Sequence, residues 1–168
     1  GTPDADEFTW EMEYDTEGHL VVMKRSESDG EITNITYKDG DVVKTSTRYV
    51  ASGDLNGDGI IDSNDEWEYS AAIDYTTDNI TAPIENKGCL MLFDEILDVD
   101  MDEMIYAYYG GMLGKATKHL PLVGHYTYNG EDSVSDMYFT WTLNSDSYPT
   151  ELVVKDQWDE YRLSLIHI

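Results

Sequence analysis

The chain of 168 residues is poor in basic residues and cysteine, and it contains no long apolar run. Lys and Arg number 10 against 35 Asp and Glu, which gives a formal net charge of −25. A field of that sign repels phosphates and anionic lipids, so it argues against nucleic-acid and lipid-surface partners and favours cations. The single cysteine, Cys89, excludes a disulfide framework within the chain, and no segment of the sequence is long and apolar enough for a transmembrane helix.

The residues that are present can build a core. Apolar residues make up 40% and aromatic residues 12% of the chain, including 13 Tyr and 4 Trp, so the composition is not that of a disordered acidic tail. The length suits one domain, and we predict a single domain over residues 1–168. The chain opens on Gly1 and shows no signal peptide, so we expect any export signal or lipid anchor to have preceded this segment.

Residues 54–65 have the spacing of a calcium loop. Calcium takes six to eight hard oxygen ligands, and EF-hand loops supply them from positions 1, 3, 5, 7, 9 and 12, with a glycine at position 6 for the sharp turn. Gly59 holds that position here, and Ile61 at position 8 is the expected apolar anchor of the loop to the core. The predicted ligands are Asp54, Asn56, Asp58, the carbonyl of Ile60, Asp62 and Asp65. The loop resembles the DxNxDG loops of dockerins and EF-hands, although it occurs once and is followed by no helical pattern.

Alternation with period two dominates the rest of the chain and predicts an all-β fold. Trp67, Tyr69, Ala71, Ile73 and Tyr75 alternate with polar or small residues, so the calcium-type loop leads into a strand. Turn signals recur about every 8–12 residues, including Asp39-Gly40, which indicates an antiparallel meander. The expected strands cover about residues 8–14, 20–26, 32–37, 42–50, 67–75, 123–128, 137–143, 151–155 and 161–168. We predict that this meander curls into an open or closed barrel.

One segment departs from this period. Between residues 98 and 110, Met101, Met104, Ile105 and Tyr108 fall on one helical face, and Gly110 follows as a stop signal. We therefore predict one short helical insertion at about residues 98–110. Asp98, Asp100 and Asp102 in its first turn repeat the spacing of metal ligands, but position 6 is not a glycine, so capping of the helix explains these acids better.

No catalytic motif is evident. The four histidines are scattered without metal-ligand spacing, and pairs of carboxylates, which hydrolyse glycosides in many enzymes, can be found anywhere among 35 acids. Aromatic side chains either line a concave surface that stacks on sugar rings or form an ordinary core. The aromatic residues concerned are Trp67, Tyr106, Tyr108, Tyr109, Tyr126, Tyr128, Tyr138 and Trp141.

Three short segments carry a family resemblance. Residues 14–20 (YDTEGHL), 113–121 (LGKATKHLP) and 146–150 (DSYPT) resemble a group of secreted Bacteroidetes proteins of unknown function with a porin-like β fold. The resemblance implies export to the periplasm or outer surface of a Gram-negative cell, with lipid anchors common in the group, and it transfers no catalytic residue.

These observations lead to one functional hypothesis and two alternatives. We expect a non-catalytic, exported, calcium-binding β-domain, which acts as a binding or envelope-associated module with a glycan or an envelope protein as its partner. The alternatives are a carrier of a small apolar ligand inside the barrel and a glycan hydrolase that uses paired carboxylates. A carrier requires an apolar cavity, and a hydrolase requires a carboxyl group with a raised pKa.

Overall fold

The computed structural model describes residues 9–26, 31–49, 53–54, 56–88, 101–129 and 135–164. Nine strands form one antiparallel sheet in the order β1-β2-β3-β4-β5-β8-β9-β10-β11, and β6 and β7 form a second sheet. The strands of the large sheet are β1 (Trp10–Tyr14), β2 (Leu20–Arg25), β3 (Ile32–Lys38), β4 (Asp41–Tyr49), β5 (Trp67–Asp74), β8 (Val123–Tyr128), β9 (Ser135–Leu143), β10 (Pro149–Lys155) and β11 (Glu160–Ser164). The small sheet pairs β6 (Ile84–Glu85) with β7 (His119–Leu120).

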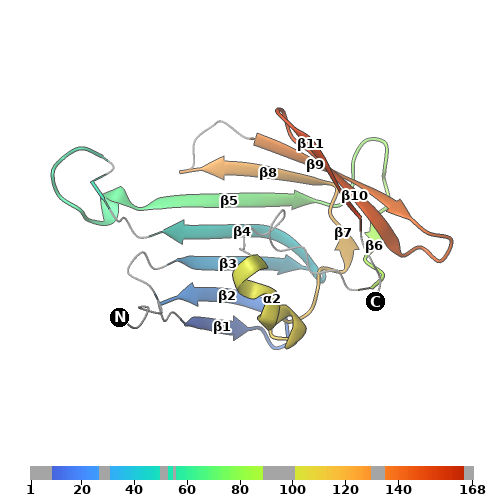
Figure 1. The fold of residues 1–168 in the computed structure, drawn as a ribbon, viewed down its shortest axis with the longest axis horizontal. Coiled ribbons are helices and arrows are strands. Elements are labelled where there is room, and N and C mark those ends of the chain that lie inside the picture. The colour runs from blue at the N-terminus through green and yellow to red at the C-terminus, as the bar shows by residue number, and fades with distance from the viewer. Residues whose placement is uncertain are drawn as a thin grey trace, which may run out of the picture.

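The predicted antiparallel meander is confirmed. Each strand of the large sheet pairs with the strand before it and the strand after it in the chain, with β8 taking its place directly after β5. In Figure 1 the axes of β1 to β5 are closely aligned, whereas β9 to β11 run obliquely to them, so the sheet curls. Within the described residues β1 and β11 are the two edges and do not pair with each other, so the sheet is open.

Period-two alternation places the core on one face of the sheet. On β5 the side chains of Ala71 and Ile73 are buried, whereas Ala72 and Asp74 between them are exposed. Buried residues of the neighbouring strands join them in one cluster, including Ile35, Tyr126 and Leu152. Phe8, at the start of the first expected strand, lies outside the described residues.

The predicted helical insertion is α2 (Met101–Tyr109), which ends in a turn at Gly110. It lies in front of the sheet in Figure 1, and its Met104 is 1% exposed within the core cluster. The proposed cap Asp100 and the lone Cys89 lie outside the described residues. No helix in the described part of the chain combines the length and apolar character needed to cross a membrane.

Candidate functional site

The calcium-type loop joins the end of β4 to the start of β5, as the sequence predicts for a connection between strands. In Figure 1 it projects beyond one end of the large sheet. Gly57 and Gly59 have φ values of +77° and +84°, which a residue with a Cβ rarely adopts. The loop ends in the 3-10 turn η1 (Ser63–Asp65) rather than in an α-helix. The two glycines allow the chain to double back on itself within a few residues.

Carboxylates organise the loop by accepting backbone N–H groups. Asp54 at position 1 accepts hydrogen bonds from Gly57, Asp58 and Gly59 at 2.7, 3.0 and 2.8 Å. Asp58 at position 5 accepts from Ile60 at 2.8 Å. These bonds turn the peptide N–H groups inward around the acids at the start of the loop, so the side chains at positions 1 and 5 lie on the inner side of the turn.

Asp65 closes the loop from within. Its side chain is fully buried, and its two oxygens accept the N–H groups of Asn56 at 3.0 Å and Asp62 at 2.9 Å. Asp62 in turn caps η1 through Asn64. The predicted anchor Ile61 is wrong, because its side chain is 60% exposed. The buried carboxylate of Asp65 therefore joins the first part of the loop, at Asn56, to its last part, at Asp62.

The donor set of the loop suits calcium chemically. Five side chains with oxygen atoms and the carbonyl of Ile60 occur at the six expected positions, and each carboxylate has about four lone-pair sites, so one oxygen can accept an N–H group and still ligate a metal. Among the described residues, however, no three His, Cys, Asp or Glu side chains converge as a ready metal group. Calcium binding by this loop therefore remains a prediction.

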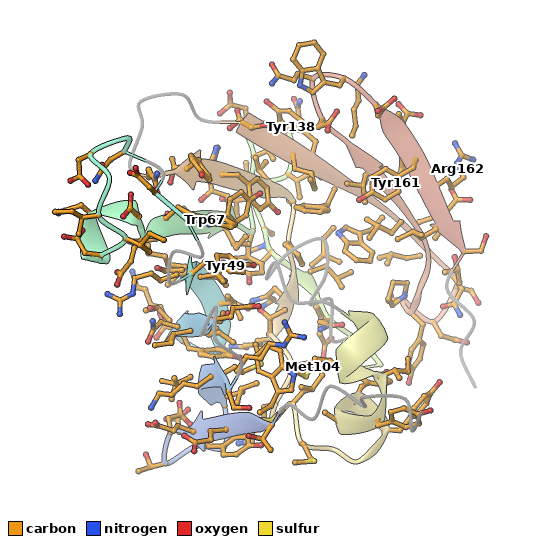
Figure 2. All side chains as sticks on the ribbon, turned by 60° about the vertical axis from the view of Figure 1, so that its left-hand side comes forward. Tyr49, Trp67, Met104, Tyr138, Tyr161 and Arg162 are labelled. Carbon is orange, nitrogen blue, oxygen red and sulfur yellow. The ribbon has the colours of Figure 1, made fainter. Side chains whose placement is uncertain are left out.

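Aromatic rings stack at the neck of the loop. Tyr49 is the last residue of β4 and Trp67 the first of β5, and they face each other across the ladder. Their ring centroids are 3.9 Å apart, and the two ring planes are nearly parallel. The ring centroid of Tyr128 in β8 lies 5.5 Å from that of Trp67. Figure 2 shows Tyr49 and Trp67 side by side close to the loop. The stack holds the two strands together where the loop leaves the sheet.

Histidine–aspartate pairs lie elsewhere on the sheet, and the sequence analysis missed them. Asp15 accepts the backbone N–H of His19 through Oδ1 and pairs with Nδ1 of the same ring through Oδ2, both at 2.9 Å. Asp41 holds His119 in the same two-point manner, at 2.8 and 2.7 Å. The first pair is visible as a four-residue spacing inside the β1–β2 turn. The second joins residues 78 positions apart, for which the sequence gives no signal.

Residues 113–120, here called the strap, bring the two pairs to one end of the sheet. Lys115 donates its backbone N–H to the carbonyl of Gly18 at 3.0 Å, and Lys118 donates to the carbonyl of Gly40 at 2.9 Å. The strap thereby crosses the β1–β2 turn and the β3–β4 turn in succession. Figure 1 shows these turns at the end of β1 to β4 away from the calcium-type loop.

An open pocket of about 400 Å³ lies between these turns and the strap. Its lining combines carboxylates, one amine and two flat rings: Asp15, Glu17, His19, Tyr37, Asp39, Gly40 and Lys115. The ring of His19 is stacked on that of Tyr37, with centroids 4.4 Å apart. Burial, and to a smaller extent the charge of Asp15, raises the pKa of Tyr37 to about 12. Hydrogen bonds, first that from the backbone N–H of His19, lower the pKa of Asp15. At neutral pH the pocket therefore contains an ionised Asp15 and a protonated tyrosine.

A third histidine, His125 of β8, lies between two carboxylates. Its Nδ1 is 2.7 Å from Asp136 of β9, and its Nε2 is 3.1 Å from Asp74 of β5. The hydrogen bond to Asp136, followed by that to Asp74, raises the pKa of His125. This cross-strand cluster is half exposed, and it links three neighbouring strands when the imidazole is protonated.

The predicted aromatic residues do not form one surface. Tyr126 is buried in the core, and Trp141 packs against the core cluster. The indole N–H of Trp141 donates a hydrogen bond to the carbonyl of Pro121 at 2.7 Å. Tyr106 and Tyr109 project from α2 with 84% and 73% of their surface exposed. The aromatic residues thus divide between the core, the neck of the calcium-type loop and the outer side of the helix.

Comparison with known families assigns the fold. A family described as a domain of unknown function (DUF4595) with a porin-like fold matches residues 4–151. The chain belongs to this family. The resemblance to porin-like proteins seen in the sequence is thereby confirmed, and the DUF4595 fold corresponds to the curled, open meander described above.

One solved structure shares the porin-like fold. The chain is similar to a porin-like protein from Bacteroides vulgatus ATCC 8482, with a TM-score of 0.66 and 16% identity. That match covers 95% of this chain and 64% of the other, so the chain spans less than two thirds of that protein. A porin-like protein from Bacteroides uniformis ATCC 8492 matches with a TM-score of 0.38, 17% identity and coverage of 96% and 91%. No curated protein matches.

Proposed function

We propose that this chain is a non-catalytic, calcium-binding domain that acts outside the cytoplasm as a binding or envelope-associated module. The observation that carries the proposal is that backbone N–H groups of the loop donate hydrogen bonds to its own carboxylates, Asp54 and Asp65. Asp54 accepts three successive N–H groups, and the fully buried Asp65 closes the loop. Calcium at this point would fix the connection between β4 and β5 and offset part of the net charge of −25.

Chemistry and fold together support an extracytoplasmic location. A single loop of this kind in an extracellular module typically binds calcium with a dissociation constant of about 10⁻⁴–10⁻³ M. Such a site is filled only where calcium is abundant, which is the case outside cells. The similarity to a porin-like Bacteroides protein is consistent with a place in the cell envelope.

Two features of the described residues favour binding over hydrolysis. Two carboxyl groups of the described residues, Asp15 and Asp156, have pKa values that backbone hydrogen bonds shift downward. A general acid in glycoside hydrolysis needs the opposite shift. On the concave side, Met104 and Leu113 from outside the sheet pack into the core cluster, which fills space that a carrier of apolar ligands would need.

Thermal unfolding with and without calcium tests the loop. For a dissociation constant of about 0.1 mM, roughly 5 mM calcium adds about 2 kcal/mol to the free energy of unfolding, a rise of about 4–8 °C in Tm. We expect this rise in the unmodified chain after removal of bound metal with EDTA, and a much smaller rise with magnesium at the same concentration.

Two variants distinguish a site from general charge effects. Asp58→Ala removes a ligand of the loop and should abolish the calcium-dependent rise. Asp146→Ala removes the same charge from the β9–β10 turn and should retain the rise. The described hydrogen bonds of Asp146 with the side chains of Lys87 and Asn144 both use its backbone atoms. An equal response of both variants to calcium would refute the loop as the binding site.

A further inference from the structure

The pocket at the strap contains a polar side chain that is buried yet open on one side. The side chain of His19 is 7% exposed, and Nδ1 is held by Asp15 at 2.9 Å. In the tautomer whose Nδ1–H donates a hydrogen bond to Asp15, the ring carries its lone pair on Nε2. Within the described part of the chain, Nε2 has no hydrogen-bond partner, and His19 lines the pocket. The pocket thus holds a fixed acceptor without a donor.

Tyr37 supplies a matching donor. Its ring is stacked on His19, which fixes its plane, and its hydroxyl group remains protonated because burial raises its pKa to about 12. The tyrosine hydroxyl likewise has no hydrogen-bond partner among the described residues. Two rings held by stacking and by Asp15 therefore present one acceptor and one donor with little freedom to move, which lowers the entropy cost of binding.

The charges around the two rings select the ligand. The lining contains three carboxylates, Asp15, Glu17 and Asp39, and one amine, that of Lys115, so acceptors outnumber donors and the pocket is net negative. Phosphates and carboxylates are repelled by such a lining, whereas hydroxyl and ammonium groups find several acceptors. The volume of about 400 Å³ lies within the ~300–1,000 Å³ typical of small-molecule sites.

We propose that this pocket binds a sugar ring that carries no negative charge, either a neutral hexose or an amino sugar. Hydroxyl groups of the ring donate to Nε2 of His19 and to the carboxylates of Glu17 and Asp39, and the hydroxyl group of Tyr37 donates to a ring or hydroxyl oxygen. Lys115 closes the side formed by the strap.

This inference deepens the proposed binding role, and it rests on that role, because it assigns the site and the ligand class. The site itself is physically separate from the calcium-type loop. β4 begins at Asp41 beside the pocket and ends at Tyr49 beside the loop, so the length of a nine-residue strand lies between them. Sugar binding and calcium binding can therefore fail independently, and each can be measured while the other is abolished.

Titration followed by ¹H–¹⁵N NMR spectra tests the proposal with glucose, glucosamine and glucuronate as probes. We expect glucose and glucosamine to shift the amide signals of Gly40 and Lys115, with dissociation constants of the order of ~1–10 mM for ligands of this size. Glucosamine should bind more tightly than glucose, and glucuronate should not bind. No shift of these signals with glucose or glucosamine, or equal binding of glucuronate, overturns the proposal.

Conservative variants locate the binding. Tyr37→Phe removes one hydroxyl group, and Asp39→Asn removes one charge at a position with φ of +55°, which Asn tolerates. Each should weaken glucosamine binding several-fold while the spectrum remains that of a folded protein. Asp146→Asn should leave glucosamine binding unchanged. Equal weakening by Asp146→Asn would reduce the effect to net charge and overturn the site.

In Asp58→Ala, sugar binding should persist after calcium binding is lost. Loss of both in this variant contradicts a separate pocket.

Discussion

At the scale of single residues, Gly114 is the position where the strap leaves no room for a side chain. Its φ is +71°, and an added Cβ would lie 2.8 Å from the carbonyl oxygen of Gly18 and 2.9 Å from the amide nitrogen of Leu20. Both neighbours are backbone atoms of the β1–β2 turn, which cannot move aside without breaking the bridge between His19 and Gly114.

We therefore predict that Gly114→Ala lowers the free energy of unfolding by about 3 kcal/mol, measured by urea denaturation. Gly111→Ala is the matched control, because its φ is +68° but no heavy atom lies within 4 Å of the added Cβ. It should cost only the left-handed backbone strain, about 1 kcal/mol. An equal decrease in the free energy of unfolding for the two variants would show that the strap does not pack closely against the β1–β2 turn at Gly114.

The hydrogen bonds of His125 make the free energy of unfolding depend on pH. Hydrogen bonds to Asp136 and then Asp74 raise the folded-state pKa above the ordinary value of 6.5. The stabilisation from this protonated cluster is therefore fully present below about pH 6.5 and is lost as the pH rises through the folded pKa. Tm measured from about pH 5.5 to 8.5 should show a downward component that His125→Gln removes.

NMR titration of the same imidazole gives an independent measurement. Asp136→Asn should lower the pKa of His125 more than Asp74→Asn, because the hydrogen bond to Asp136 is the larger cause of the shift. The reverse order, or a pKa of His125 at its ordinary value in the unmodified chain, would contradict the arrangement described for β5, β8 and β9.

Single residues also show where sequence reasoning reaches its limit. The connection between β4 and β5 through the calcium-type loop could be predicted because its signals lie within twelve consecutive residues and follow from local chain geometry, whereas its binding of calcium is still a prediction. The pocket could not, since Asp39 and Lys115 come from distant segments and meet only after the strap crosses the turns. The prediction for Ile61 was wrong because the burial of a loop residue depends on what packs against the loop, and the side chain of Ile61 is 60% exposed.

At the scale of elements, α2 packs on the core through Met104 and Ala107 among its described side chains. Met104 is 1% exposed and belongs to the core cluster, whereas Ile105 and Tyr108 on the face predicted to be apolar are each 36% exposed. The helix therefore turns a narrow stripe toward the sheet and presents several aromatic rings outward. Period alone predicted that a helix exists here, but it did not reveal that Ile105 and Tyr108 are each 36% exposed.

We predict that Met104→Ala destabilises the domain by about 3 kcal/mol, because it leaves a cavity between α2 and the sheet. Tyr106→Ala on the same helix should change the free energy of unfolding by less than about 0.5 kcal/mol, since that side chain is 84% exposed. Urea denaturation of both variants measures the difference. A small effect of Met104→Ala would mean that α2 is not part of the cooperative core.

The strands were the easiest elements to predict, and the short sheet was the hardest. Strict alternation in β5 and the Asp39-Gly40 turn fixed local structure, and sequential pairing followed from the short connections. β6 and β7 have two residues each, and they pair across the 33 intervening positions between Glu85 and His119, a segment that includes the predicted helix. A two-residue strand has no period, so only the folded chain shows it.

At the scale of the whole molecule, the excess of 35 acidic over 10 basic residues dominates the electrostatics. Self-repulsion of a net charge of −25 destabilises the compact state at low ionic strength. The Debye length falls from about 30 Å at 0.01 M salt to about 8 Å at 0.15 M, which is shorter than the span of the sheet. Much of this repulsion between distant acids should then disappear.

We predict that Tm rises by several degrees between about 10 mM and 150 mM NaCl, measured in EDTA so that the loop binds no divalent ion. Calcium chloride at the same ionic strength should add a second increment in the unmodified chain. The first increment acts through screening and should survive in Asp58→Ala, whereas the second acts through the loop and should vanish. If sodium at matched ionic strength reproduces the whole effect of calcium, the acids of the loop act only as part of the general charge, and the winding of residues 54–65 serves to turn the chain.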